Sequence, residues 1–297
     1  MSSPSTVVLI TGTFQSFSHP HSTLAFTISL TGFFQGANSG IGYATSKVIA
    51  SSSSKYHVIM ASRSSEKGSA ACEAVQAAGI KGKVSSIQLD VTDQSSIAVA
   101  VKQVEKDHGR LDVLVNNAGV SSKATTLKES LEATFNTNVM GAALVAEAFT
   151  PLLLKSPNAY LLHISSGLGS LTLASDASRW DSKIDAPAYR MSKAALNMLM
   201  VQDAKTLGKQ GVKVFAICPG LVESNLRGES QMERTAGGNA KSPEVSGQLI
   251  LRIMEGERQA DVGNLYMKME FILGKSGKVD RRTNFPSDDV LGFLPGT

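Results

Sequence analysis

Residues 6–12 read TVVLITG and residues 36–42 read GANSGIG, and these two stretches decide the expected fold. The first is a short β-branched, apolar run that ends at a glycine, as strands buried on both faces of a parallel sheet do. The second is a glycine-rich turn that leads into an apolar stretch with helical spacing to about Ala50. Glycines in such a turn let backbone N–H groups and a helix N-terminus approach a pyrophosphate. A glycine cluster alone also fits a plain flexible turn, but here a helix and a second strand follow it.

Later runs repeat the form of the first strand, and segments with helical spacing separate them. These runs lie at residues 56–61, 84–89, 111–115, 160–164 and 212–217. Alternating strands and helices predict a parallel sheet covered on both faces, with ligands at the carboxyl ends of the strands. We therefore predict an α/β fold: one doubly wound, Rossmann-type domain over residues 1–297, with a parallel sheet of about seven strands.

Composition limits the classes of partner. The chain has 297 residues, 42% hydrophobic and 18% charged, and a formal net charge of +4 without a basic block. That length allows a substantial core, and the spread of charge argues against nucleic-acid binding. The two cysteines, Cys72 and Cys218, have no CxxC spacing, which indicates a reducing compartment and no metal site.

No targeting or membrane segment is expected from the sequence. Residues 1–6 lack the charged and apolar regions of a secretion signal. The longest apolar stretch, residues 24–34, is too short and too rich in hydroxyl groups to span a bilayer. We therefore expect a cytoplasmic protein without a membrane partner.

Residues 13–36 interrupt the pattern, because they separate the first strand from the rest of the glycine turn. Without them the sequence reads VVLITGANSGIG, an uninterrupted strand and phosphate loop. The amino acids at both edges permit codons for a splice donor, a branch point and an acceptor. Our hypothesis is that this anomalous insert is a retained short intron, which a mature transcript would lack.

A second interpretation keeps the insert and lets residues 24–30 replace the first strand. Thr31 and Gly32, followed by Gly36, then imitate the start of the loop. That register puts Asn38 where the last glycine belongs, whereas Gly36, Gly40 and Gly42 complete the loop. We favour a looped-out or spurious insert.

Tyr189 and Lys193 open the apolar run 194–201 and lie four residues apart. On a helix this spacing places the phenol and the ammonium group on one face. A nearby cation lowers the pKa of a tyrosine from about 10, which produces an acid able to protonate a carbonyl oxygen as hydride arrives at carbon. Such a pair alone is more often an ordinary solvated pair.

In combination, these motifs resemble those of the short-chain dehydrogenase/reductase family over about residues 6–227. They are Thr11-Gly12 with Gly36, Gly40 and Gly42, the NNAG of residues 116–119, Ser165-Ser166, Tyr189 with Lys193, and Pro219-Gly220. Residues 165–170 (SSGLGS) and 189–198 (YRMSKAALNM) are most similar to the carbonyl reductase and C-factor-like branch.

The resemblance implies four catalytic residues. Tyr189 would donate the proton, Lys193 would lower its pKa and hold the nicotinamide ribose, and Ser166 would bind the substrate oxygen. Ser165 is the neighbouring alternative to Ser166. Asn138 would hold a helix kink and a water of the proton relay, or would be an amide bonded locally within its helix.

The resemblance also implies a site for NADP(H). Arg63 follows the second strand, where NAD-binding relatives have an acid, and could pair with a 2′-phosphate. Asp90 could accept from the adenine amino group or cap the helix that starts near Asp93. Residues 116–119 could brace a turn or line the dinucleotide. The full set is Gly12, Gly36, Ser39, Gly40, Ile41, Gly42, Arg63, Asp90, Val91, Asn117, Ala118, Gly119, Tyr189, Lys193, Pro219, Gly220, Val222 and Ser224.

We therefore expect NADPH-dependent reduction of a ketone or aldehyde to an alcohol, or the reverse, on a small-molecule substrate. The alternative is a catalytically inactive NADP-binding or misprocessed chain, because the glycine loop is interrupted. A P-loop is excluded because Met269 stands where the glycine upstream of Gly274-Lys275-Ser276 belongs, and no GxSxG elbow occurs.

Several features are left open by the sequence. Specificity should lie in residues 121–126, 168–188 and 221–240. The long stretch between Ser166 and Tyr189 carries Trp180, which could stack on a substrate or anchor its own loop. The tail, residues 268–297, matches no expected element, and both a monomer and a homo-oligomer remain open.

Overall fold

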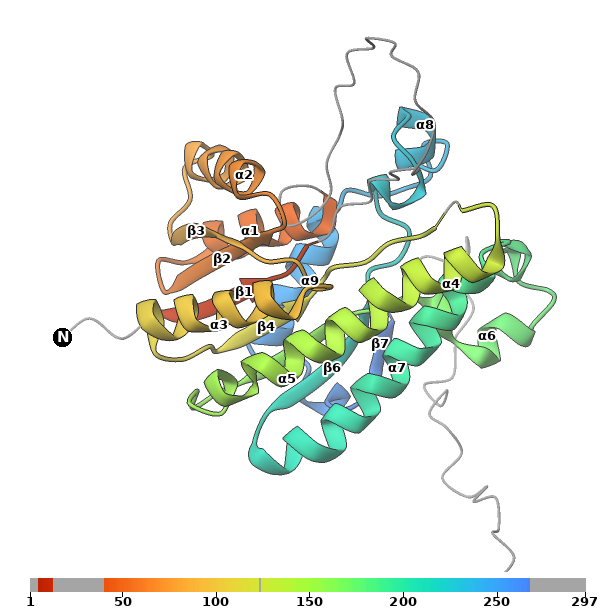
Figure 1. Ribbon diagram of the computed structural model, residues 1–297. Coiled ribbons are helices and arrows are strands. Elements are labelled where there is room, and N and C mark those ends of the chain that lie inside the picture. The colour runs from red at the N-terminus through yellow and green to blue at the C-terminus, as the bar shows by residue number, and fades with distance from the viewer. Residues whose placement is uncertain (1–4, 13–39, 123, 268–297) are drawn as a thin grey trace, which may run out of the picture.

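The computed structural model describes residues 5–12, 40–122 and 124–267, and its first strand, β1 (Thr6–Ile10), lies inside the sheet (Figure 1). This strand pairs in parallel with β2 (Tyr56–Ser62) on one side and β4 (Val113–Asn116) on the other. Val8 is the register partner of both Val58 and Val113. The position of the first strand is therefore filled by Thr6–Ile10, and the interpretation that residues 24–30 replace it is wrong. The insert itself, residues 13–36, lies outside the described residues.

The sheet has seven strands in the order β3-β2-β1-β4-β5-β6-β7. Its remaining members are β3 (Lys83–Gln88), β5 (Tyr160–Ile164), β6 (Lys213–Cys218) and β7 (Leu265–Met267). All neighbouring strands are parallel. The order reverses between β1 and β4, which opens a crevice at the carboxyl ends of the strands. The predicted doubly wound fold is confirmed.

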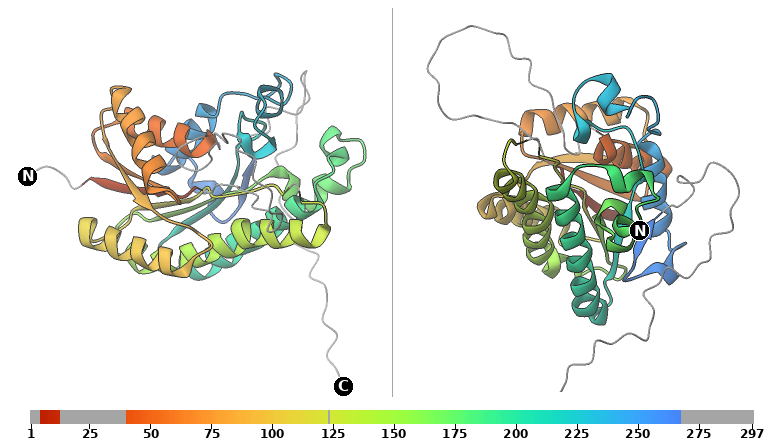
Figure 2. Two further views of the ribbon diagram at one scale, coloured as in Figure 1. Left: turned by 45° about the horizontal axis from the view of Figure 1, so that its top comes forward. Right: turned by 90° about the vertical axis from the view of Figure 1, so that its right-hand side faces the viewer.

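Helices cover both faces of this sheet because its strands are apolar on both sides (Figures 1 and 2). Alternate residues of β1 enter opposite cores: Val8 and Ile10 belong to one, and Val7 and Leu9 to the other. Burying such a side chain contributes roughly 1.5–3 kcal/mol. The first core includes α1 (Gly40–Ser52), α2 (Ser65–Ala77) and α9 (Glu244–Met254), and the second α3 (Gln94–His108), α5 (Ala142–Leu153) and α7 (Pro187–Leu207).

Short elements complete the carboxyl edge of the sheet. A single turn of π-helix, η1 (Asn136–Gly141), joins α4 (Leu127–Phe135) to α5. After β5 come η2 (Gly167–Gly169), α6 (Leu171–Ser175) and η3 (Trp180–Lys183), and after β6 come η5 (Asn225–Arg227) and α8 (Gln231–Arg234). In the described part of the chain, no helix combines the length and apolar character needed to cross a membrane.

Candidate active site

Tyr189 and Lys193 lie one turn apart on α7, as their spacing predicts. The Lys193 ammonium group is 5.6 Å from the centroid of the Tyr189 ring. It is 3% exposed, and its Nζ donates to the carbonyl of Ile164, at the end of β5, at 2.7 Å. The pair is thereby fixed to the carboxyl edge of the sheet.

Burial governs the protonation of both side chains. It lowers the pKa of Lys193 to about 8, opposed by the nearby Cys218. Burial and Cys218 raise the pKa of Tyr189, while Ser166 and the Arg227 guanidinium lower it. From its spacing to Lys193, Tyr189 was expected to have a pKa lowered towards neutrality. In this structure its pKa is raised instead, because burial disfavours the charged phenolate more than the neighbouring groups stabilise it. Tyr189 therefore carries its proton at neutral pH.

The structure separates the roles of Ser165 and Ser166. Ser165 is 2% exposed, and its hydroxyl donates to Asn197 Oδ1 at the back of the site. Ser166 is partly exposed, and its hydroxyl interacts with Tyr189 and accepts from the Leu168 N–H at 3.2 Å. Only Ser166 has its hydroxyl beside the phenol.

Asn138 is fully buried on the π-helix η1 and joins two distant segments. Its Oδ1 accepts from the Val120 N–H at 2.7 Å, and its Nδ2 donates to the Val120 carbonyl at 2.9 Å. The same Nδ2 donates to Ser192 Oγ at 2.9 Å, and Ser192 donates to the Tyr189 carbonyl at 2.8 Å. The reading of Asn138 as a locally bonded amide is therefore wrong. It ties the loop after β4 to the turn of α7 that carries Tyr189.

The ends of β1 and β4 are joined through Thr11. Its hydroxyl accepts from the N–H groups of Asn117 and Ala118, at 3.1 and 3.2 Å, and the Asn117 side chain donates to its carbonyl. These bonds show that residues 116–119 brace the turn. A Cβ added to Gly119 would lie 3.4 Å from Asn138 Oδ1 and 3.5 Å from Lys193 Nζ. A side chain at this position would therefore lie directly against two of the candidate catalytic residues.

The glycine turn and the turn after β6 meet at the same edge. Gly12 ends the described part of the first segment, and Gly40, Ile41 and Gly42 begin α1. A Cβ on Gly40, whose φ is +55°, would lie 3.8 Å from Ser224 Cβ. Gly36 and Ser39 lie outside the described residues.

The remaining predicted residues of this turn have different exposures. Pro219 and Gly220 follow β6, and Gly220 has a φ of +77°, which glycine adopts without strain. Val222 is only 4% exposed, so little of its side chain is open to a ligand.

At the far end of the crevice, Arg63 and Asp90 are neighbours. Burial lowers the pKa of Arg63, and Asp90 raises it. Asp90 Oδ1 accepts from the N–H and hydroxyl of Thr92, whereas Asp93 caps α3 by accepting from the Ser95 N–H. The alternative that Asp90 caps this helix is wrong. Val91 is 1% exposed and packs on Gly141, so its side chain is covered.

Three residues of the site were not assigned roles from the sequence. Ser192 links Asn138 to Tyr189, and its only signal was its place inside the Tyr–Lys spacing. Cys218 accepts from the Gly167 N–H at 3.1 Å and interacts with Lys193, and burial raises its pKa. Arg227 acts on the tyrosine from the loop after β6.

The long segment between Ser166 and Tyr189 is tied to α7 by Arg190. Its guanidinium donates to the carbonyls of Ile184, Leu168 and Asp181. Trp180, on the same segment, is 53% exposed. It is therefore not buried as an anchor within its own loop.

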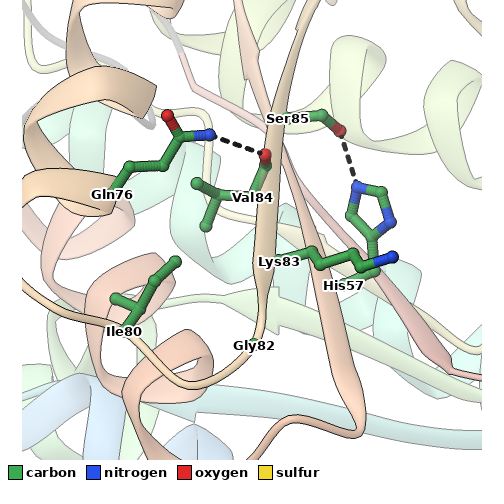
Figure 3. A pocket seen from close by; sticks show the side chains of 7 residues that line it. All are labelled: His57, Gln76, Ile80, Gly82, Lys83, Val84 and Ser85. Atoms are coloured by element: carbon green, nitrogen blue, oxygen red, sulfur yellow. Dashed lines mark hydrogen bonds between the residues drawn. The ribbon is translucent and has the colours of Figure 1, made fainter.

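A separate hollow lies at the opposite, amino-terminal end of the strands (Figure 3). Among its lining residues, His57 and Ser85 are hydrogen-bonded at 2.9 Å, and Gln76 donates to the Val84 carbonyl. Because the four candidate catalytic residues lie at the other end, this hollow does not belong to the site. The described residues contain no group of three or more His, Cys, Asp or Glu side chains that could hold a metal.

Comparisons with known proteins agree with this geometry. A family model described as short chain dehydrogenase matches residues 33–235. The short-chain dehydrogenase/reductase tropE of Talaromyces stipitatus is 34% identical over 248 residues, which cover 78% of this chain and 93% of that protein. The short-chain dehydrogenase anuI of Penicillium roqueforti is 36% identical over 224 residues, or 73% of this chain and 85% of that protein.

Among solved structures, a metagenomic short-chain oxidoreductase in complex with NADP is similar to this chain. The two share 25% sequence identity with a TM-score of 0.63. The match covers 89% of this chain and 96% of that one.

Proposed function

The chain belongs to the short-chain dehydrogenase/reductase family and is an oxidoreductase, and on that basis we propose that it interconverts a ketone or aldehyde and the corresponding alcohol with NADP(H). The observation that carries the proposal is the meeting of Ser166, Tyr189, Lys193 and Asn138 at the carboxyl edge of the sheet. The likeness of residues 165–170 and 189–198 to carbonyl reductases belongs to the same proposal.

The residues at this edge fit a nicotinamide dinucleotide. A Cβ on Gly119 would lie against Lys193, where glycine adds no side chain, and Gly40 has a φ of +55°, which glycine adopts without strain at the start of α1. Gly12, Gly40, Asn117, Gly119, Lys193, Pro219, Gly220 and Ser224 would hold such a cofactor. When bound, it would supply or accept the hydride.

The preference for NADP(H) is argued from the end of β2. Arg63 stands there with serines on both sides and no acid. An acid would accept from the ribose hydroxyl of NAD, whereas an arginine can pair with a 2′-phosphate. The similar oxidoreductase in complex with NADP supports the same choice.

The chain's own residues would move the proton and steady the oxygen. Because burial keeps Tyr189 protonated at neutral pH, its phenol would donate to the carbonyl oxygen during reduction. The Ser166 hydroxyl would donate a hydrogen bond to the same oxygen. Asn138 would keep Tyr189 in place by holding Ser192, which donates to the Tyr189 carbonyl.

Replacing Tyr189 by Phe tests this proposal. Removing the acid should lower turnover of a reducible ketone about 10²- to 10⁴-fold. NADPH binding, measured by nicotinamide fluorescence, should stay nearly unchanged because the ring remains. Tyr56→Phe, at the amino end of β2, is the control. Comparable turnover in Tyr189→Phe and the unaltered chain would show that Tyr189 is not the proton donor.

The interrupted glycine loop favours a second candidate function, a chain that binds NADP(H) without catalysis. Residues 13–36 stand between Gly12 and the helix that begins at Gly40. Full-length chain that binds NADPH but turns over no carbonyl compound, while a chain without this segment does, would favour that alternative.

A further inference from the structure

Arg227 is a partly buried cation near the candidate general acid, and no role proposed above uses its ability to bind a ligand. It ends η5, in the segment that follows Pro219-Gly220 at the carboxyl edge of the sheet. Its guanidinium interacts electrostatically with Tyr189. The guanidinium also donates to the Val222 carbonyl, in the loop that follows Cys218, and Cys218 Sγ accepts from the Gly167 N–H next to Ser166. The loop that carries Arg227 therefore lies at the same edge of the sheet as the candidate catalytic residues.

Three backbone carbonyls hold the guanidinium in place. Nε donates to the carbonyl of Glu233 at 3.0 Å, and Nη2 donates to those of Val222 at 2.8 Å and Arg234 at 2.5 Å. Within the described chain, Nη1 makes no hydrogen bond. Because the five N–H donors form a rigid, planar fork, fixing one edge also fixes the direction of the other. The donors of Nη1 are thus oriented before any ligand arrives.

Arg227 also lacks an ion pair in the part of the chain that the structure describes. The nearby carboxylate of Glu223 bonds to Arg234 at 2.5 Å. That of Glu233 accepts from the N–H and hydroxyl of Ser230. Partial burial of this cation lowers the pKa of Arg227, and the nearby Tyr189 and Glu223 oppose that shift without forming an ion pair with it. A negatively charged ligand would offset the cost of this burial.

We propose that Arg227 forms an anion-binding subsite of the substrate mouth, and that the natural carbonyl substrate carries an ionised acidic group such as a carboxylate. The inference rests on the proposed carbonyl reduction. Arginine suits this role because its fork matches the two oxygens of a carboxylate. Reduction would leave the acidic group unchanged, since the hydride and proton are added at the carbonyl.

Matched pairs of probes test the subsite by binding alone. We would titrate 3- and 4-formylbenzoate, and the neutral methyl ester of each, into the full-length chain saturated with NADP⁺, using calorimetry. The oxidised cofactor cannot reduce the aldehyde, so binding is measured without turnover. The unaltered chain should bind at least one acid about tenfold or more tightly than its ester, as expected for charge-assisted hydrogen bonds.

Variants of Arg227 distinguish the effect of its charge from the effect of its bonds to the loop. Arg227→Gln removes the charge together with the three carbonyl bonds, so the ratio of acid to ester affinity is the quantity compared. This ratio should fall to about one in Arg227→Gln, whereas Arg227→Lys, which keeps the charge, should retain part of the preference. Arg252→Gln, an exposed arginine on α9, should leave the ratio unchanged. Acids that bind no better than their esters in the unaltered chain, or a ratio preserved in Arg227→Gln, would overturn the proposal.

Two further measurements show which anion Arg227 binds and test the proposed carbonyl reduction separately. If Arg227→Gln weakens NADPH binding as much as acid binding, the anion is a cofactor phosphate and the substrate subsite is wrong. Turnover of the esters with NADPH reports on the proposed function separately. If the esters are not reduced but the acids still bind more tightly than their esters, the proposed carbonyl reduction is wrong and the anion site is supported.

Discussion

Lys193 is a charge that the fold buries at a cost. Only 3% of it is exposed, and burial lowers its pKa from 10.5 to about 8. Such a shift corresponds to about 3 kcal/mol of lost stability while the group is protonated in both states. A residue retained at this cost is expected to act in chemistry.

Replacing Lys193 by Met should therefore stabilise the protein while removing its activity. At pH 7 we expect the free energy of unfolding to rise by about 1–3 kcal/mol, since the lost hydrogen bond to Ile164 offsets part of the gain. Urea unfolding of both proteins measures this. Lys209→Met, at an exposed position after α7, is the control.

The pH dependence of the gain has a defined sign. The unfolded chain keeps this proton up to about pH 10.5 and the folded chain only to about pH 8. Stability of the unaltered protein therefore rises across that window, and the advantage of the variant should shrink there. A gain that is constant from pH 7 to 10 would show that the charge of Lys193 is not the cause.

For single residues, the sequence predicted the spacing of side chains along a helix better than the groups that each side chain contacts. The four-residue step from Tyr189 to Lys193 becomes one helical turn, as expected. The raised pKa of Tyr189 and the position of Arg227 depend on burial and on a loop from another strand. Neither has a signal in the local pattern.

The packing of η2 against α7 is the contact that fixes the catalytic helix. A Cβ on Gly169 would lie 2.5 Å from the carbonyl carbon of Lys193 and 2.7 Å from the Ala194 nitrogen. Backbone atoms cannot rotate away from such a clash. The two elements approach this closely because residue 169 is glycine.

Gly169→Ala should push α7 away from the ends of β5 and β6. We expect a loss of about 1–3 kcal/mol in stability and a drop in kcat/KM of at least about tenfold, because small misplacements of catalytic groups are costly. Gly208→Ala is the matched control, since a Cβ there meets nothing within 4 Å and its φ is −59°. Equal stability and kinetics in the two variants would contradict the packing argument.

Most elements of the sheet were predictable, because buried parallel strands are continuous apolar runs. The strand predicted at 111–115 begins later, at Val113, and the Leu111 N–H donates to the Leu152 carbonyl of α5 rather than to a neighbouring strand. The range of β7 was missed, since three residues give no periodicity. The clamp of Arg190 on the segment before Tyr189 is a tertiary contact and left no pattern either.

The position of residues 13–36 matters for the whole molecule. They interrupt the chain between β1 and α1. The family match begins at residue 33 and leaves that strand outside, although it is paired on both sides. We propose, as before, that the segment is a retained intron and that the functional chain lacks it.

Removing residues 13–36 should therefore strengthen NADPH binding, by about tenfold or more. The shorter connection loses less conformational entropy when its backbone N–H groups are ordered around a phosphate. Fluorescence titration of both chains with NADPH measures the difference. Equal affinities would show that the segment is harmless to the site.

The order of strands and motifs along the chain was enough to predict the overall architecture. Parallel strands joined by helices have few allowed topologies, so the alternation of elements fixes the crevice. The tail, residues 268–297, lies outside the described residues. Which substrate enters the crevice depends on loop shapes that no local pattern encodes.

Transfer of deuterium from [4,4-²H₂]NADPH, in which either transferable hydrogen is labelled, to a carbonyl compound tests the central claim most directly. Methyl 4-formylbenzoate would be incubated with the full chain, with the chain lacking residues 13–36, and with the Tyr189→Phe form of each. Mass spectrometry of the alcohol should show one deuterium on the carbinol carbon with at least one Tyr189 form, and none above background with its Phe variant. Absence of label with both Tyr189 forms, or equal label with Tyr189→Phe, would contradict it.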